Sequence, residues 1–488
     1  MPANNQVQLI TYPDSLGGDL KALNQVLLQH FRDIFKGGIH ILPPFPSSGD
    51  RGFAPLTYLE IEPAFGTWED VKRIGDNFDI LVDLMVNHIS RKSVYFQDFL
   101  EKGRDSEHAD LFITLDKVWK DGVPVQEDID KIFLRRPKPY STFALPSGEE
   151  VSVWTTFGRE NPSEQIDLDI HSEKTMRLLT DFFTNFAENN IKIVRLDAVG
   201  FVIKKLGTSC FFVEPDIFEF LDKMKSLADS LGIELLPEVH AHYEIQKKLA
   251  DRGYWIYDFI LPFTVLDTML NGDSRALTSY LKVRPSNQFT MLDCHDGIPV
   301  LPDLRGFIDV GDARKVVDLC VQRGSTLSLI VSDEHKGEGG FDVHQIGGTY
   351  YEVLGRDDDA YLAARAIQFF APGVPQVYYV GLLAGENDYD AVKATGENRA
   401  MNRHNYSLEE IEASLRKDVV QRLLALIRFR NEYPAFNGTF EVLPSANDEV
   451  RLEWRNGDSR CTLFVDLTAK RTVIDYVDDR GAAAQYRV

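Results

Sequence analysis

Three acidic side chains stand where short apolar runs of the sequence end. Asp197, Glu238 and Asp296 follow the segments 191–196, 233–237 and 289–292. Short apolar runs of this kind predict buried parallel strands. In a barrel, the carboxyl ends of such strands converge on one face, where catalysis takes place. Several acids gathered there predict acid/base and nucleophilic chemistry on a bond that needs protonation before it breaks.

Eight apolar runs supply the framework that must position these acids. They lie at residues 7–11, 38–42, 80–86, 191–196, 233–236, 255–259, 289–292 and 374–380. Amphipathic stretches such as 175–189 and 217–230 alternate with them. Alternation of strands and helices predicts parallel strands joined by crossover helices. We therefore expect an α/β fold, a (β/α)8 TIM barrel, which takes ~250 residues before insertions.

Uneven spacing between the runs predicts two insertions and a further domain. We expect an inserted small domain B after the third strand and a second insertion, domain B′, after the seventh strand. Alternating short strands after residue 437 predict a C-terminal antiparallel β-domain. The expected limits are 1–87, 169–296 and 351–436 for the barrel, 88–168 for domain B, 297–350 for domain B′ and 437–488 for the C-terminal domain.

Composition narrows the class of protein. The chain has 488 residues and a formal net charge of -22, which opposes nonspecific binding to nucleic acid or to an anionic membrane. Its four cysteines are scattered without metal-site spacing, so no metal is predicted and a disulfide framework is not expected. No secretory leader or membrane-spanning run is visible. We expect a cytoplasmic protein, either a monomer or a homodimer.

Four segments resemble the active-site regions of a known family. They are Val82–His88, Val194–Val199, Pro237–His240 and Leu292–Asp296. They are similar to the four regions of the α-amylase superfamily, glycoside hydrolase family thirteen. Further segments resemble its sucrose phosphorylase branch: Val7–Tyr12, Gly207–Cys210, His295–Ile298, Pro372–Gly381 and Asn402–Tyr406. Taken singly, an acid at a strand end is more often a cap or turn residue, and His88 could be structural. The joint pattern favours function.

The resemblance implies roles for the acids. Asp197 would be the nucleophile, Glu238 the general acid/base and Asp296 a stabiliser of the transition state. Retaining enzymes of this kind hold the first two carboxyl groups about 5–5.5 Å apart. Arg195 should keep Asp197 ionised, and desolvation should keep Glu238 protonated. The residues that the resemblance places around the glucosyl ring are Asp50, Phe53, His88, Phe157, Arg195, His295 and Arg403.

A cluster of cations marks the acceptor side. Three cations, Arg135, Arg136 and Lys138, occur within a span of four residues, although the chain as a whole is strongly acidic. A solvated basic loop is the simple interpretation. The resemblance favours another, because sucrose phosphorylases have Pro and Tyr where this chain has Arg135 and His344, whereas relatives selective for sucrose 6'-phosphate have Arg and His. A phosphorylated sugar brings an anion that Arg135, Lys138 and His344 could bind.

Other residues complete the expected acceptor site. Asp342 and Gln345 would contact acceptor hydroxyls, and Arg136 and His240 match positions associated with the attacking phosphate. The predicted activity is that of a retaining phosphorylase, a hexosyltransferase that uses sucrose 6'-phosphate and inorganic phosphate without a cofactor. Alternatives are a sucrose phosphorylase, a glucosylglycerol or glucosylglycerate phosphorylase, a simple hydrolase, and an inactive barrel that serves as a binding subunit.

Overall fold

The computed structural model describes residues 4–301, 304, 306–331 and 336–488. Its centre is an eight-stranded parallel sheet with the order β10-β11-β15-β1-β2-β3-β8-β9. β9 and β10, at the two ends of this order, contact each other, so the sheet curls into a barrel. The strands are β1 (Gln8–Thr11), β2 (Gly38–Ile41), β3 (Ile80–Met85), β8 (Ile191–Asp197), β9 (Glu234–Pro237), β10 (Ile256–Asp258), β11 (Gln288–Thr290) and β15 (Val374–Tyr378).

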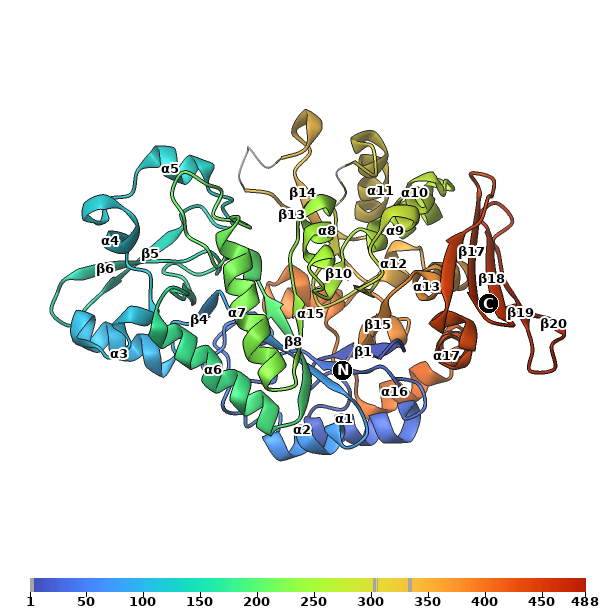
Figure 1. The fold of residues 1–488 in the computed structure, drawn as a ribbon, viewed down its shortest axis with the longest axis horizontal. Coiled ribbons are helices and arrows are strands. Elements are labelled where there is room, and N and C mark those ends of the chain that lie inside the picture. Colours follow the sequence, from blue (N-terminus) through green and yellow to red (C-terminus); the bar gives the residue numbers. More distant parts are fainter. Residues whose placement is uncertain (1–3, 302–303, 305, 332–335) are drawn as a thin grey trace.

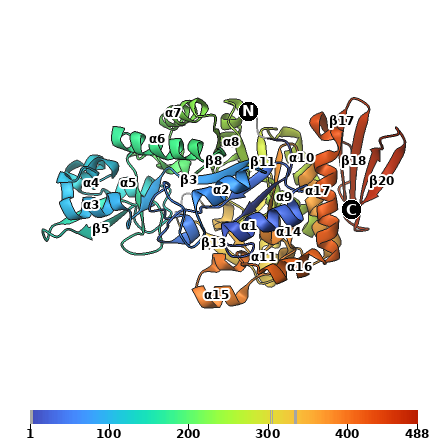
Figure 2. The same cartoon turned by 90° about the horizontal axis from the view of Figure 1, so that it is seen from below.

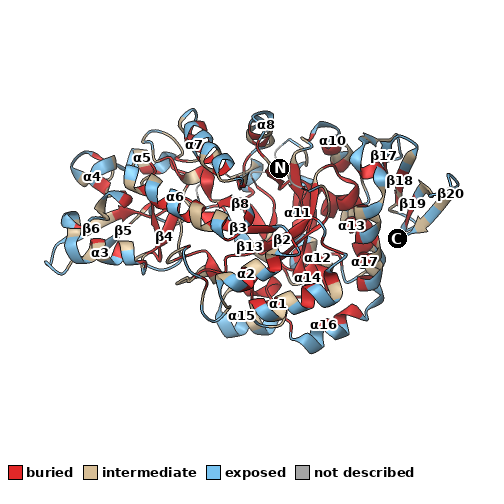
Figure 3. Ribbon diagram, turned by 60° about the horizontal axis from the view of Figure 1, so that its bottom comes forward, coloured by how far each residue is buried: buried red, intermediate tan, exposed pale blue. Residues whose placement is uncertain are grey.

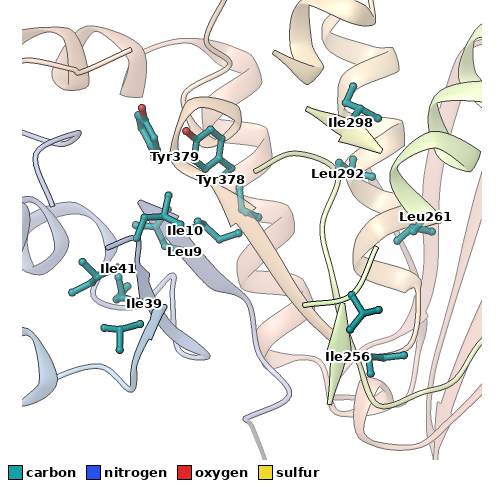
Figure 4. Close-up of a cluster of buried hydrophobic side chains, with 14 of the residues drawn as sticks. Leu9, Ile10, Ile39, Ile41, Ile256, Leu261, Leu292, Ile298, Tyr378 and Tyr379 are labelled. Atoms are coloured by element: carbon teal, nitrogen blue, oxygen red, sulfur yellow. The ribbon is translucent and has the colours of Figure 1, made fainter. Parts of the chain in front are cut away.

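All eight predicted strands are confirmed, and burial explains why they could be recognised. Every residue of β1, β2 and β3 is buried, because helices cover the outside of the barrel and side chains fill its inside. Figure 4 shows Leu9 and Ile10 beside Ile39 and Ile41 of the neighbouring strand, within one hydrophobic core. Figure 3 shows buried residues concentrated along the barrel.

Amphipathic helices surround the barrel, as the sequence predicts. In α6 the buried residues Leu178, Leu179, Phe182, Phe183 and Phe186 recur at helical spacing and cover one face. The helices of the barrel and its connections are α1 (Leu20–Val26), α2 (Trp68–Gly75), α6 (Glu173–Glu188), α7 (Asp216–Ser230), α8 (Tyr243–Asp251), α9 (Leu261–Asn271), α10 (Arg275–Val283), α12 (Tyr350–Val353), α13 (Asp358–Phe370), α14 (Tyr379–Leu382), α15 (Tyr389–Thr395), α16 (Leu408–Leu415) and α17 (Asp418–Glu432).

Both predicted insertions contain small antiparallel sheets. The first follows β3 and holds β4 (His88–Ser90), α3 (Val94–Lys102), α4 (Leu115–Val118), α5 (Gln126–Lys131), β5 (Tyr140–Ala144), β6 (Glu150–Trp154) and β7 (Gln165–Asp167). The second follows β11 and holds β12 (Ile298–Pro299), α11 (Val310–Gln322), β13 (Thr326–Leu329) and β14 (Val343–Gly347). Part of this second segment lies outside the described residues. The limits 88–168 and 297–350 stay predictions.

A five-stranded antiparallel sheet ends the chain, opposite the first insertion in Figure 1. Its strands are β16 (Thr439–Val442), β17 (Glu449–Asn456), β18 (Ser459–Asp466), β19 (Arg471–Val477) and β20 (Ala483–Arg487). The first four were predicted. β20 was not, because its alanine-rich segment lacks apolar alternation. Trp454 donates a hydrogen bond to the Phe370 carbonyl (2.7 Å), which ties this sheet to the barrel through α13. Figure 2 shows α17 between the two.

None of the helices that the structure describes combines the length and apolar character needed to cross a bilayer.

Candidate active site

A cavity of about 310 Å³ opens where the carboxyl ends of the barrel strands meet. The three predicted catalytic acids, which come from distant parts of the chain, share it. Its lining combines acidic, basic and aromatic side chains, among them Asp50, Phe53, His88, Phe133, Arg135, Phe157, Asp197, Phe201, Glu238, His240, His295, Asp296, Ser328, His344, Gln345 and Arg399.

Asp197, the last residue of β8, is held by Arg195. The Nη1 atom of Arg195 donates to Asp197 Oδ1 at 2.7 Å and to Asp83 Oδ1 at 2.6 Å. Asp83 lies fully buried in β3 and also contacts His40 Nε2 at 2.8 Å. Asp83 therefore fixes the guanidinium from behind. We did not predict this residue, although a lone acid inside an apolar strand is a recognisable sign of a buried ion pair.

Glu238 directly follows β9 and reaches the same guanidinium. Ala198, in the left-handed backbone region with φ 55°, turns the chain after Asp197 and directs its N–H to Glu238 Oε2 at 3.1 Å. Glu238 Oε1 lies 3.1 Å from His240 Nε2 and 3.6 Å from Arg195 Nη2. The two acids thus share Arg195 as a common neighbour.

In the ligand-free arrangement, the surroundings favour the proton of this pair on Asp197, whereas the sequence reasoning expects it on Glu238. Burial, the largest effect, raises the pKa of Asp197 to about 7; Arg195 opposes it, and the Glu238 carboxylate adds to it. Burial also acts to raise the pKa of Glu238, but Arg195 and His240 outweigh it and lower this pKa to about 2. Desolvation alone does not set the pKa of Glu238, because this carboxylate also has Arg195 and His240 as neighbours. The pair holds one proton near neutral pH, and the general-acid role expected for Glu238 requires that proton on Glu238.

Asp296 and Asp50 are bridged by Arg399. Its Nη1 atom lies 3.1 Å from Asp296 Oδ1 and 3.2 Å from Asp50 Oδ2. Burial opposes ionisation of Asp296, but Arg399, His295 and Arg403 outweigh it and hold its pKa far below the usual range. Arg399 was missed by the sequence reasoning. Its position four residues before Arg403 was the only available sign.

The remaining residues expected around the glucosyl ring lie on the same side of the cavity. The ring of Phe53 stacks on His295 at 4.7 Å, and His88 Nε2 contacts the Phe53 carbonyl at 3.0 Å. Burial lowers the pKa of both histidines, that of His295 to about 3, so both are neutral and suited to hydroxyl groups. Arg403 stands behind this layer, with its Nε donating to the His295 carbonyl at 3.0 Å and its Nη1 3.5 Å from Asp50.

On the acceptor side the structure brings Arg135 and His344 together. Arg135 Nη1 lies 3.0 Å from His344 Nε2, although 209 residues separate them in the chain. Gln345 lines the same wall, and the ring of His240 lies 5.9 Å from that of His344. Burial, followed by Arg399, lowers the pKa of Arg135 to about 10. A buried cation with a depressed pKa is one whose charge is poorly compensated.

Three expected acceptor residues lie elsewhere. Arg136 donates to the Phe157 and Glu160 carbonyls, both at 3.1 Å, and so supports the loop that carries Phe157. Lys138 is exposed, with its Nζ 5.8 Å from the Tyr140 ring. Asp342 is half-buried beside β14. All three are among the residues that the structure describes, and none of them lines the 310 Å³ cavity.

One group of possible metal ligands occurs among the described residues. Glu238, His240 and Asp296 place ligand atoms within 4.8 Å of one another. His240 already contacts Glu238, and Arg399 already contacts Asp296. The protein's own side chains therefore compensate these two carboxylates.

A barrel that gathers acids, arginines and aromatic walls at its carboxyl end is suited to acid/base and nucleophilic chemistry of the kind that breaks glycosidic bonds. Residues 4–259 match the model of the alpha amylase catalytic domain. The chain belongs to the alpha-amylase family.

Two relatives narrow the comparison. The chain is 65% identical over 489 residues to the sucrose 6(F)-phosphate phosphorylase of Thermoanaerobacterium thermosaccharolyticum, covering 100% of both chains. It is 43% identical to the sucrose phosphorylase of Streptococcus mutans, covering 94% of each. It also superposes on the crystal structure of sucrose 6F-phosphate phosphorylase from Thermoanaerobacter thermosaccharolyticum with a TM-score of 0.98, at 65% identity, covering 100% of this chain and 99% of the other.

Proposed function

We propose that the protein is a retaining disaccharide phosphorylase that acts on sucrose 6'-phosphate. It converts this sugar and inorganic phosphate into α-D-glucose 1-phosphate and D-fructose 6-phosphate. Full-length identity of 65% to a sucrose 6(F)-phosphate phosphorylase supports the reaction. The observation that carries the choice of acceptor is the Arg135–His344 pair, which lies within the cavity that holds the three acids.

In the first half-reaction, Asp197 Oδ attacks the anomeric carbon while Glu238 gives its proton to the departing glycosidic oxygen. The C–O bond to fructose 6-phosphate breaks as the C–O bond to Asp197 forms. In the second half-reaction, a phosphate oxygen attacks the same carbon, Glu238 takes up the proton of the attacking group, and Asp197 leaves as a carboxylate. Two inversions give retention. Asp296, held ionised by Arg399, stabilises the cationic character of both transition states.

The acceptor half suits an anion. Arg135 is half-buried and its contact is with a neutral imidazole, so an arriving phosphate group supplies the missing negative charge. A neutral fructosyl group offers no such compensation. The same argument favours sucrose 6'-phosphate over sucrose in a chain whose net charge of -22 would otherwise repel a dianion.

A substrate panel with inorganic phosphate tests the proposal. We expect kcat/KM for sucrose 6'-phosphate to exceed that for sucrose, glucosylglycerol and glucosylglycerate. Equal values, or values that favour sucrose, would overturn the choice of acceptor and leave a sucrose phosphorylase. Free glucose formed at the same rate with and without phosphate would indicate a hydrolase instead.

The ligands of the enzyme follow from this proposed activity. Its partners are a sugar phosphate and inorganic phosphate, with no role for nucleic acid or membrane. A cytoplasmic location and a monomeric or homodimeric state stay predictions.

A further inference from the structure

We propose that His344 selects the phosphorylated sugar through a contact that requires one added proton, which the imidazole and the 6-phosphate group then share. The free enzyme does not carry this proton and takes it from solvent when the sugar phosphate binds. The inference rests on the proposed function, since it concerns the same acceptor site.

The hydrogen-bond partners of His344 determine which ring nitrogen carries hydrogen. The Nε2 atom lies 3.0 Å from Arg135 Nη1, and a guanidinium can only donate. The Nδ1 atom lies 2.7 Å from the Leu301 carbonyl oxygen, which can only accept. His344 is therefore a neutral imidazole with hydrogen on Nδ1 and a lone pair on Nε2.

This tautomer cannot meet a phosphate dianion. The Nε2 lone pair accepts from Arg135, and it would repel a phosphate oxygen, which is also an acceptor. The Nδ1–H already donates to the Leu301 carbonyl. This hydrogen therefore cannot move to Nε2 without leaving that carbonyl unpaired. A contact between Nε2 and phosphate therefore needs a proton, either as imidazolium or as a protonated phosphate oxygen. No covalent bond changes apart from those to this proton.

The charged groups around His344 explain why the proton is absent before binding. His344 is only 3% exposed. Burial lowers its pKa most, and Arg135 and His240 lower it further, whereas the Leu301 carbonyl and Asp296 oppose the shift. A phosphate dianion that displaces Arg135 Nη1 from Nε2 and contacts both side chains would reverse the balance, because its negative charge favours the imidazolium.

Calorimetry of the wild-type enzyme tests proton uptake directly. Fructose 6-phosphate is titrated near pH 7.5 in buffers that differ in ionisation enthalpy. Its own phosphate group, with a pKa of about 6, is already a dianion at this pH. We expect uptake that approaches one proton for fructose 6-phosphate and none for fructose. Binding of fructose 6-phosphate without proton uptake would overturn the inference while leaving the proposed function intact.

Kinetics give a second test. The ratio of kcat/KM for sucrose 6'-phosphate to that for sucrose cancels the titration of the catalytic acids that both substrates share. We expect this ratio to fall about tenfold per pH unit between pH 7 and pH 8, the slope of one linked proton. In His344→Gln the ratio should no longer depend on pH in this interval. The control His171→Gln, on an exposed residue, should keep the wild-type slope.

The outcomes separate the two levels of argument. An unchanged slope in His344→Gln would overturn the proton-linked contact. A failure of fructose 6-phosphate to bind, together with a preference for sucrose at every pH, would overturn the proposed function and this inference with it. The calorimetric experiment needs no variant, so a folding defect in His344→Gln would not prevent a decision.

Discussion

The two halves of the cavity treat charge in different ways. In the glucosyl half, fixed partners surround each charge: Arg195 lies between Asp83 and Asp197, and Arg399 lies between Asp50 and Asp296. In the acceptor half, Arg135 contacts a neutral His344, and among the described residues no carboxylate forms an ion pair with it. The first half is built for a neutral ring. The second holds a cation whose counter-charge must come from the ligand.

Removal of the nucleophile should have the largest effect. We expect Asp197→Asn to lower kcat by about 10⁴-fold or more on every substrate, because no covalent intermediate can form. The measurement is phosphate-dependent release of the sugar product. Asp181→Asn, an exposed acid on α6, is the matched control and should retain activity. Undiminished turnover in Asp197→Asn would contradict the mechanism through a covalent intermediate on Asp197.

Loss of Arg195 should destabilise the glucosyl half itself. Arg195→Met removes the cation shared by the buried Asp83 and the partly buried Asp197, and should lower the free energy of unfolding by about 3–5 kcal/mol. Chemical denaturation measures this change. Arg104→Met removes a surface ion pair with Asp116 and should cost less than about 1 kcal/mol. Equal losses in the free energy of unfolding for the two variants would mean that Arg195 does not compensate the charges of Asp83 and Asp197.

Loss of Arg135 should instead affect one substrate. Arg135→Ala should cost about 1.5–3 kcal/mol in kcat/KM for sucrose 6'-phosphate, the value of a charge-assisted hydrogen bond. The loss on sucrose should be much smaller, because its fructosyl group has no phosphate. Paired kinetics on the two sugars give the result, and equal losses would erase the distinction between the halves. Lys138→Ala, an exposed cation outside the cavity, serves as the comparison.

The shared proton predicts a basic limb in the pH profile, which is small near neutral pH. The pKa of Asp197 is raised to about 7, so the acid pair keeps its proton below this pH and loses it above. Because Glu238 needs that proton, kcat/KM for sucrose should fall as the pH rises through about 7, by about tenfold per unit beyond it. A pH–rate profile measures this. A profile that stays flat to pH 9 would contradict the assignment of one proton to the pair.

Local sequence patterns were sufficient to predict the barrel strands and the acids at the ends of those strands. The eight strands are continuous apolar runs, and the side chains of Asp197 and Glu238 take their positions from the ends of those strands. Each of these features depends on a few consecutive residues, so it could be predicted without knowledge of the fold. β20 escaped prediction because its segment carries no such pattern.

What the tertiary structure decided was the pairing of charges. The contact of Arg135 with His344, the bridge of Arg399 between Asp50 and Asp296, and the position of Asp83 behind Arg195 all join distant segments. The same is true of the low pKa of Glu238, because burial raises this pKa but Arg195 and His240 together outweigh it. Periodicity along a chain determines which face of an element is buried, but electrostatic energy depends on distances through space. The sequence alone therefore determined the barrel and the candidate acids at its strand ends, whereas only the folded chain decided where each proton and each unpaired charge would lie.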